Sequence, residues 1–293
     1  MFNSITVVRA DRVKQMGGLT EASSGALVVS TYRTPDTSGG TAFPHHFVGG
    51  KWTGIFSFFR TYPEVLNKYE YFWFPDDDIQ TTPEDADRFL EIVKREGFQL
   101  AQPALEPDSY YAHRITLANP LLSFRRTNFV ELMMPILHRD LLLKVLPLFE
   151  GRHFAQGLDY MWHQLSRNPE RDVAIIDETP MGHRRPRQVC LKGNMSKMQV
   201  DMMSEREATF RELNICRQAP VVISAKTKDG IELQRSSRLT VKLLMGMWSC
   251  RAKITRQPWS ANDYFRMLGQ QALGRTNTTT SSYVQPTSVC RAR

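Results

Sequence analysis

Long hydrophobic runs are scarce in this chain of 293 residues, and their absence excludes a membrane-spanning protein. A transmembrane helix needs roughly 18 uninterrupted apolar residues. The two best candidates, residues 141–149 and 239–250, are shorter and contain Lys144 and Lys242. The first residues also lack the basic flank and apolar run that mark a secretory signal. We therefore expect a cytoplasmic protein.

Cysteine is scarce as well, and its spacing excludes a cysteine-based metal clip. Cys190, Cys216, Cys250 and Cys290 lie far apart, with no CxxC pair among them. Hydrophobic residues make up 41% of the chain, with 16 Phe and 5 Trp, which is enough apolar material for a large core. The length fits one large catalytic domain with an appendage, or two domains.

Charge divides the chain into two parts. Residues 1–183 carry 18 Lys and Arg against 23 Asp and Glu, a net charge of −5, whereas residues 184–293 carry 20 against 7, a net charge of +13. We place a boundary here: a catalytic domain over 1–187, a basic helical and hairpin extension over 188–275, and a flexible tail over 276–293. The basic part is either a solvated surface or the contact for a polyanion, which would be an anionic membrane surface or a nucleic acid.

Hydrophobic periodicity predicts an α/β fold. Residues 26–31 and the aromatic run 69–74 are typical of strands, and the spacing of apolar residues over 50–60 predicts a helix between them. A second helix begins after Thr82 and ends before Gly97. Further elements are expected as a strand at 98–102, a helix over 157–166, a strand over 173–177, a hairpin joining 219–224 to 231–234, and a last helix over 260–274.

Three adjacent carboxylates, Asp76, Asp77 and Asp78, follow the aromatic strand directly. Like charges this close repel one another, so we expect a cation beside them. In an extended segment Asp76 and Asp78 project to one side while Asp77 faces away. Carboxylate oxygens suit Mg²⁺ or Mn²⁺, which share the rest of their coordination with water and phosphate. The alternative is a helix-capping or merely acidic loop.

An ordered set of motifs resembles a known family. The set comprises GGKW at 49–52, YEYFWFPDDDI at 69–79, QPAL at 102–105, FVE at 129–131 with Met134-Pro135, GLDY at 157–160 and IIDETPMGHRRP at 175–186. Together these resemble the plant and bacterial family known as domain of unknown function 707, which is similar to GT-A glycosyltransferases. The resemblance covers about residues 26–187. It implies a GT-A-like, Rossmann-like mixed sheet flanked by helices, a nucleotide-sugar donor and a DxD motif with a divalent metal.

The resemblance also implies roles for single residues. Asp78 is the expected main metal ligand, and Asp76 shares the metal or contacts the ribose of the donor. Asp77 is assigned only to the donor site. His183 resembles the later histidine that joins the metal or the diphosphate in many GT-A enzymes. On its own, a histidine followed by two arginines would more often be a surface residue.

Three further residues are candidates from their local sequence. Gly50 and Lys51, at the start of a helix, are expected to approach the donor's nucleobase or diphosphate, because backbone N–H groups at such a position attract anions. A solvated helix lysine is the alternative for Lys51. Asp159, between apolar and aromatic neighbours, is a candidate general base for the acceptor hydroxyl. A helix cap is its alternative role.

The sequence therefore predicts a metal-dependent glycosyltransferase, inverting, with Mn²⁺ or Mg²⁺. It moves a sugar from a nucleotide sugar to a hydroxyl of a surface polysaccharide or lipid-linked glycan, peripherally at the inner face of the membrane. Three alternatives stay open. One is a glycosyltransferase that acts on modified nucleic-acid bases, another is a metal-dependent hydrolase or nuclease, and the third is a non-catalytic sugar-nucleotide binder.

Overall fold

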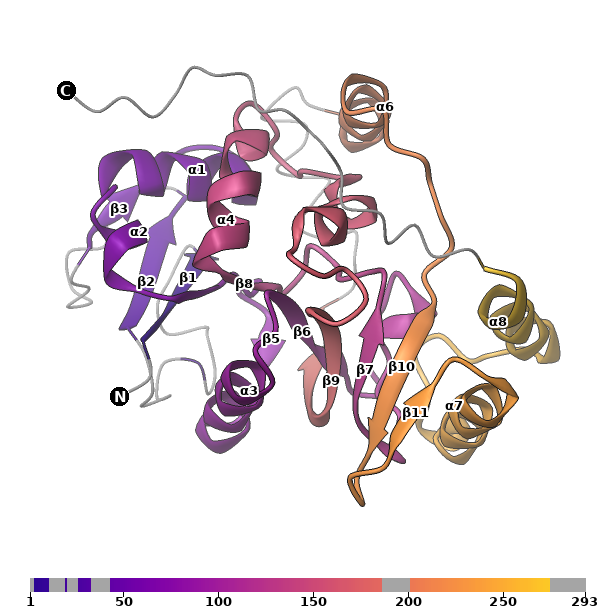
Figure 1. Cartoon of the computed structure of the whole chain (residues 1–293). Helices are drawn as coiled ribbons and strands as arrows, with labels where there is room; N and C mark the ends of the chain where they lie inside the picture. The colour runs from indigo at the N-terminus through magenta and orange to yellow at the C-terminus, as the bar shows by residue number, and fades with distance from the viewer. Residues whose placement is uncertain (1–2, 11–18, 20–25, 33–42, 186–200, 275–293) are drawn as a thin grey trace.

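A mixed β-sheet lies between two layers of helices in the computed structural model (Figure 1). The structure describes residues 3–10, 19, 26–32, 43–185 and 201–274. The tail expected over 276–293 and the first residues of the expected extension, 188–200, lie outside these ranges.

The strand order of the sheet is β11-β10-β7-β9-β6-β8-β4-β1-β2-β3, and β5 pairs with β9 off this path. Strands β4, β1, β2 and β3 are parallel to one another, as are β6 and β9, whereas β8, β7, β10 and β11 are antiparallel to their neighbours. The expected fold class, a Rossmann-like mixed sheet flanked by helices, is confirmed. The strands are β1 (Ser4–Ala10), β2 (Ala26–Thr31), β3 (His45–His46), β4 (Tyr71–Trp73), β5 (Ile79–Gln80), β6 (Leu100–Leu105), β7 (Leu122–Thr127), β8 (Ile136–His138), β9 (Val173–His183), β10 (Val222–Thr227) and β11 (Glu232–Gln234).

Two apolar clusters hold the helices to opposite faces of the sheet. One contains the buried sides of α1 and α4 and the helical turns after α4, while the other contains those of α3 and part of α7. The helices are α1 (Lys51–Thr61), α2 (Val65–Lys68), α3 (Pro83–Glu96), α4 (Arg139–Val145), α6 (Met202–Glu212), α7 (Ser237–Ser249) and α8 (Ala261–Leu273). Short 3-10 turns are η3 (Arg114–Thr116), η4 (Leu146–Phe149), η5 (Leu158–Tyr160), η6 (Trp162–Leu165) and η7 (Arg251–Lys253). Within the described residues, no helix has both the length and the apolar character to cross a membrane.

Helix α3 has the ends that its sequence predicts. The Thr82 hydroxyl accepts a hydrogen bond from the backbone N–H of Asp85 at 3.1 Å, and Gly97 ends the helix in the left-handed conformation with φ 70°. The hairpin of β10 and β11 is also confirmed, with Gly230 at φ 85° in its turn. Both features depend on neighbouring residues alone, which is why the sequence was sufficient to predict them.

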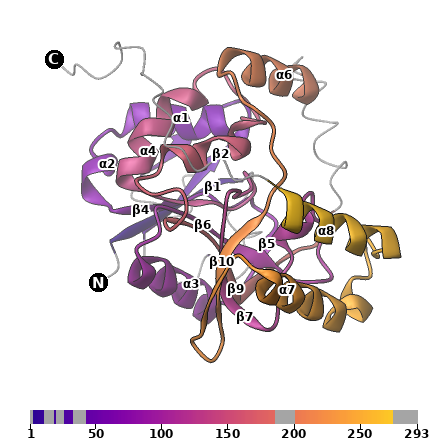
Figure 2. The ribbon, with the colours of Figure 1, turned by 45° about the vertical axis from the view of Figure 1, so that its right-hand side comes forward.

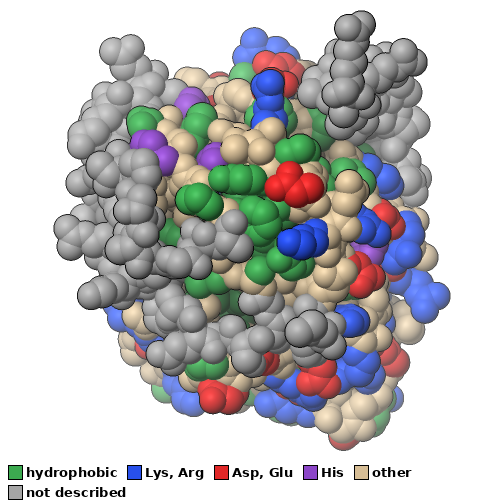
Figure 3. Space-filling view, turned by 90° about the vertical axis from the view of Figure 1, so that its left-hand side faces the viewer, with side chains coloured by type: hydrophobic (Ala, Val, Ile, Leu, Met, Phe, Trp, Pro, Cys, Tyr) green, Lys and Arg blue, Asp and Glu red, His purple; other side chains and the backbone are tan. Residues whose placement is uncertain are grey.

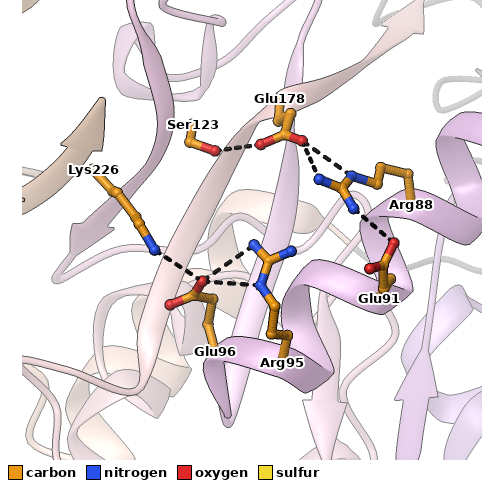
Figure 4. Close-up of polar contacts among 7 residues, drawn as sticks. All are labelled: Arg88, Glu91, Arg95, Glu96, Ser123, Glu178 and Lys226. Carbon is orange, nitrogen blue, oxygen red and sulfur yellow. Dashed lines mark hydrogen bonds and ion pairs between the residues drawn. The ribbon is translucent and has the colours of Figure 1, made fainter. Parts of the chain in front are cut away.

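Two groups of polar contacts join α3 to the sheet (Figure 4). In the first, Arg88 on α3 donates to Glu178 on β9, and Glu178 also accepts from Ser123 on β7. In the second, Glu96, at the end of α3, pairs with Lys226 on β10. The second group therefore joins elements from both sides of the boundary expected near residue 187.

Within the described residues 201–274, strands β10 and β11 extend the same sheet. β10 pairs antiparallel with β7, with Val222 opposite Thr127 and Ala225 opposite Arg125. The segment 157–166, expected as one helix, is two 3-10 turns instead. Met161 lies between them at φ −130°, ψ −28°, outside helical geometry, because Trp162 is anchored by its indole N–H to the carbonyl of Val130.

Candidate functional site

The three aspartates lie where parallel strands end. Asp76 follows β4 and forms an isolated parallel bridge with Arg9 near the end of β1, and its backbone N–H donates to the carbonyl of Met133 at 2.9 Å. Ile79 then pairs with His183 at the end of β9. The carboxyl ends of strands in such sheets are where ligands bind. The fold therefore brings the acidic cluster and His183, which are 105 positions apart, to one place.

Lys51 is the cation beside Asp76. Its ammonium lies 2.6 Å from Oδ1 of Asp76 and also donates to the backbone carbonyls of Leu132 and Met133, at 2.9 and 2.8 Å. An ammonium has three hydrogens, and all three meet protein acceptors here. The structure thus joins Lys51 to the acidic cluster, and direct contact of Lys51 with a donor diphosphate stays a prediction. The Lys51 side chain keeps 13% of its surface exposed, and that of Asp76 keeps 38%.

The other two aspartates have different partners. Asp77 lies 3.2 Å from Arg185, and burial raises the pKa of Asp77 to about 6 in spite of that arginine. Asp78 lies 3.2 Å from Nε2 of His183 and 3.6 Å from Nε of Arg185. Burial acts to raise the pKa of Asp78, but the hydrogen bond with His183 and the charges of His183 and Arg185 together leave this pKa below its usual value. Each aspartate therefore has its own neutralising group.

The contact of Asp78 with His183 fits a divalent cation. Nδ1 of His183 lies 2.8 Å from the carbonyl of Tyr110, which can only accept, so Nδ1 carries a hydrogen. A second hydrogen on Nε2 makes His183 a cation that donates to Asp78, and Asp78 raises the pKa of His183 in spite of burial. A neutral ring would instead present a lone pair on Nε2 toward a carboxylate oxygen that also has only lone pairs. Two acceptors at 3.2 Å need a proton or a metal ion between them. Octahedral ions with ligands at about 2.1 Å hold adjacent ligand atoms about 3 Å apart.

The three expected metal ligands are only partly assembled. Asp78 and His183 meet, but Asp76 is paired with Lys51. Among the described residues, no group of three or more His, Cys, Asp or Glu side chains is arranged to hold a metal ion. A cation at Asp78 and His183 would therefore take most of its coordination from water or a diphosphate.

The start of α1 is filled by another segment of the protein. The backbone N–H of Gly50 donates to Nδ1 of His153 at 3.2 Å, and that of Trp52 to the His153 carbonyl at 3.3 Å. A Cβ on Gly50 would lie 2.2 Å from that carbonyl oxygen, so the close approach of His153 accounts for the glycine. Contact of Gly50 with the donor stays a prediction. His153 is held in turn by Glu205 of α6, which accepts from its backbone N–H.

Asp159 is buried, with 4% of its surface exposed. Its carboxylate accepts from the backbone N–H of Gly157 at 3.2 Å. Burial raises the pKa of Asp159 to about 7, although Arg206 and Arg217 lower it by their charge. A carboxylate with this pKa is able to take up a proton near neutral pH, as a general base must.

The segment 130–133 touches both parts of the site. Its Val130 carbonyl accepts from the indole N–H of Trp162, just after Asp159, and its Met133 carbonyl accepts from Lys51. On the other side, Phe210 of α6 packs its ring against Tyr160 with centroids 5.8 Å apart. Asp159 is therefore enclosed between the strand ends and a helix that follows residue 200.

Residues that the sequence did not single out hold His183 in position. Ser109 accepts from the backbone N–H of His183 at 3.0 Å, and the carbonyl of Tyr110 fixes its ring. The next residue, Tyr111, donates its hydroxyl to the Gln257 carbonyl and accepts from the indole of Trp259, at 3.1 and 2.8 Å. No local motif marks these tyrosines. Arg185, by contrast, lies two positions after His183 in the same motif, and its positive charge could have predicted a carboxylate partner.

Comparisons with known proteins give one family and a set of solved structures. Residues 50–128 match the model of a family described as a protein of unknown function, DUF707. No curated protein matches the chain. The S. aureus TarS 1–349 structure in complex with UDP-GlcNAc is 10% identical, with a TM-score of 0.47, over 92% of this chain and 80% of that one. A mycobacterial protein is 15% identical, with a TM-score of 0.42, over 73% of this chain and 76% of its own.

A further TarS structure from S. aureus is 10% identical, with a TM-score of 0.40, over 73% of this chain. The present chain spans 43% of its length. The family match covers 79 residues, among them Lys51 and the three aspartates. The resemblance to the family known as domain of unknown function 707 is therefore confirmed for residues 50–128.

Proposed function

We propose that this protein is a GT-A-type glycosyltransferase that moves a sugar from a nucleotide-sugar donor to a hydroxyl acceptor. One observation carries the proposal. Nε2 of His183 and a carboxylate oxygen of Asp78 lie 3.2 Å apart at the carboxyl ends of strands, where ligands bind in such sheets, and a divalent cation would replace the proton between them. The family match over the acidic cluster supports the same site.

Asp78 and His183 are the residues that would hold Mn²⁺ or Mg²⁺. When bound, the ion supplies positive charge that stabilises the departing diphosphate. Lys51 neutralises Asp76 and, through its bonds to two carbonyls, fixes the segment 130–133 against the cluster. Asp76, still partly exposed, is then free to accept from a ribose hydroxyl or to share the ion.

Asp159 is the proposed general base. It removes the proton of the acceptor hydroxyl as that oxygen bonds to the anomeric carbon and the bond from this carbon to the diphosphate breaks. The proton ends on the Asp159 carboxylate, and the electron pair leaves with the diphosphate. A base opposite the leaving group makes the reaction inverting. The raised pKa of Asp159 suits this transfer at neutral pH.

The acceptor we propose is a hydroxyl of a surface polysaccharide or a lipid-linked glycan, reached from the cytoplasmic side of a membrane. A modified nucleic-acid base is the competing acceptor, because the charge of +13 after residue 183 would also suit a polynucleotide. A hydrolase would use the same carboxylates on water.

A thermal-shift screen of nucleotide sugars, with and without Mn²⁺, tests the proposal. We expect one donor to raise the melting temperature only with the metal, since ligand binding to the folded state stabilises it. Asp78→Ala and His183→Ala should abolish the shift, whereas the exposed Asp140→Ala removes the same charge as Asp78→Ala and should keep it. A shift that persists in Asp78→Ala contradicts the metal site. Donor cleavage that needs no acceptor would instead establish a hydrolase.

A further inference from the structure

Helix α7 presents a row of exposed apolar side chains. Val241, Met245 and Trp248 have 53%, 57% and 54% of their surface exposed. Their spacings of four and three residues place them on one face of the helix. The opposite face, with Leu239, Leu243 and others, packs against the protein. These three exposed side chains are therefore not needed to hold α7 to the core.

Helix α8 continues the apolar surface. It lies beside α7 at one end of the molecule (Figure 2), and the rings of Trp248 and Tyr264 meet with centroids 5.5 Å apart. Phe265, next to that contact, is 70% exposed, and Leu273 at the end of α8 is 83% exposed. Trp248 thus lies at the junction of the two helices.

The segment 235–273, which contains the two helices and their connection, is strongly basic. Between residues 235 and 273 there is one acidic residue, Asp263, which caps α8 and pairs with Arg114. The face at the other end of the sheet, seen in Figure 3, instead mixes acidic and basic side chains. The seven basic residues of the segment are exposed or half-buried; they are Arg235, Arg238, Lys242, Arg251, Lys253, Arg256 and Arg266.

Arg251, one of these arginines, makes a cation–π contact with Trp248. The guanidinium of Arg251 lies 4.5 Å from the centroid of the Trp248 ring. The apolar ring of Trp248 and the charged guanidinium of Arg251 therefore lie side by side. This combination is found where proteins contact the headgroup region of a bilayer.

We propose that α7 and α8 form a docking surface for an anionic lipid membrane. The basic side chains are complementary to the headgroups, and the tips of Met245, Trp248, Phe265 and Leu273 enter the boundary between headgroups and acyl chains. Nucleic acid explains the surface less well, because a phosphate backbone attracts the charges but gains nothing from aliphatic tips such as Val241 and Met245. This surface does not depend on the catalytic assignment.

Vesicle sedimentation of the full chain tests the surface. We expect binding to phosphatidylcholine vesicles that contain phosphatidylglycerol, little binding to pure phosphatidylcholine, and weaker binding as salt rises. Phe265→Ser should lower the partition constant about tenfold or more, from the apolar area lost. Arg238→Gln and Lys242→Gln should each lower it about fivefold. Arg60→Gln on α1 is the matched control, since it removes an exposed charge from another helix.

Three outcomes would overturn the proposal. The first is an absence of binding to anionic vesicles. The second is binding that Phe265→Ser and Lys242→Gln leave at the level of Arg60→Gln. The third is retention on duplex DNA with none on vesicles, which would assign the basic surface to nucleic acid. All substituted side chains are at least partly exposed, and a thermal melt of each variant checks that the fold is kept.

Discussion

Two aspartates of this protein are equally buried but differently partnered. Asp177, in the middle of the sheet on β9, accepts two hydrogen bonds from Arg125 and one from the backbone N–H of Asn119, all at 2.8 Å. Asp159 accepts instead from backbone N–H groups, among them that of Gly157 at 3.2 Å. Neither has more than 4% of its surface exposed.

The difference indicates which buried charge serves structure and which serves chemistry. Arg125 also donates to the carbonyls of Ile115 and Leu117, so both members of the Asp177 pair have full sets of partners. Such a pair fixes elements in place and leaves no group free to react. Asp159 lacks these partners, and burial raises its pKa to about 7. An incompletely paired carboxylate of this kind is typical of a catalytic site.

The largest effect should come from Asp159→Asn. We expect turnover of the donor found in the screen to fall by about 10²- to 10⁴-fold, because the amide cannot accept the proton of the acceptor. Donor affinity should stay near that of the wild type, and the melting temperature should not fall, because the amide places no charge in the buried site. Single-turnover kinetics with a donor titration measure both quantities. Full activity in this variant would remove Asp159 from the mechanism.

Arg125→Met should destabilise the fold without a specific effect on chemistry. Removing the arginine leaves Asp177 buried without its cation, at a cost of about 3–5 kcal/mol in the free energy of unfolding. Urea denaturation gives this value. The control is Arg95→Met on α3, an exposed arginine paired with Glu96, for which we expect about 1 kcal/mol or less. If both variants lost the same free energy of unfolding, the buried pair would contribute no more to stability than the exposed one.

The pH dependence of stability should separate wild type from Asp159→Asn. The folded pKa of about 7 exceeds the ordinary aspartate pKa of 3.8, so between these pH values the folded state binds more protons than the unfolded state. Stability conferred by Asp159 therefore declines as pH rises from 4 to 7, by about 4 kcal/mol at most. Arg206, Arg217 and Tyr160 are the ionisable neighbours that act on it.

Urea denaturation of both proteins at several pH values measures this difference. The wild type should lose stability relative to Asp159→Asn over that window, and its turnover should rise through pH 7 as the base loses its proton. Parallel curves for the two proteins would show that Asp159 titrates normally.

The smallest effect should come from Tyr111→Phe. The variant loses the hydroxyl that joins Gln257 and Trp259 to the loop holding His183. We expect the affinity for Mn²⁺ to fall about 2- to 10-fold, the range for one or two net hydrogen bonds. Calorimetric titration of the metal without donor measures it. An unchanged affinity would show that His183 is positioned by Ser109 and Tyr110 alone.

Features set by neighbouring residues were predictable from the sequence. The cap at Thr82, the stop at Gly97 and the hairpin around Gly230 all follow from short-range rules. The position of the acidic cluster at a strand end was also predictable, because the aromatic run before Asp76 can only be a buried strand.

Contacts between distant segments were not predictable in the same way. Nothing near Lys51 shows that its ammonium would meet Asp76 and two carbonyls, and nothing near Gly50 shows that His153 would fill the start of α1. The two 3-10 turns around Met161 likewise depend on an anchor at Val130. These arrangements arise from packing of the whole chain, which local patterns do not encode.

The pairing of β10 with β7 has a consequence for any attempt to shorten the protein. β7 is bordered by β9 on one side and by β10 on the other. A version truncated before residue 200 would leave β7 as an exposed edge strand, whose unpaired backbone donors and acceptors could bind other molecules. Such edge strands template intermolecular strand pairing, so the shortened protein would tend to self-associate and precipitate.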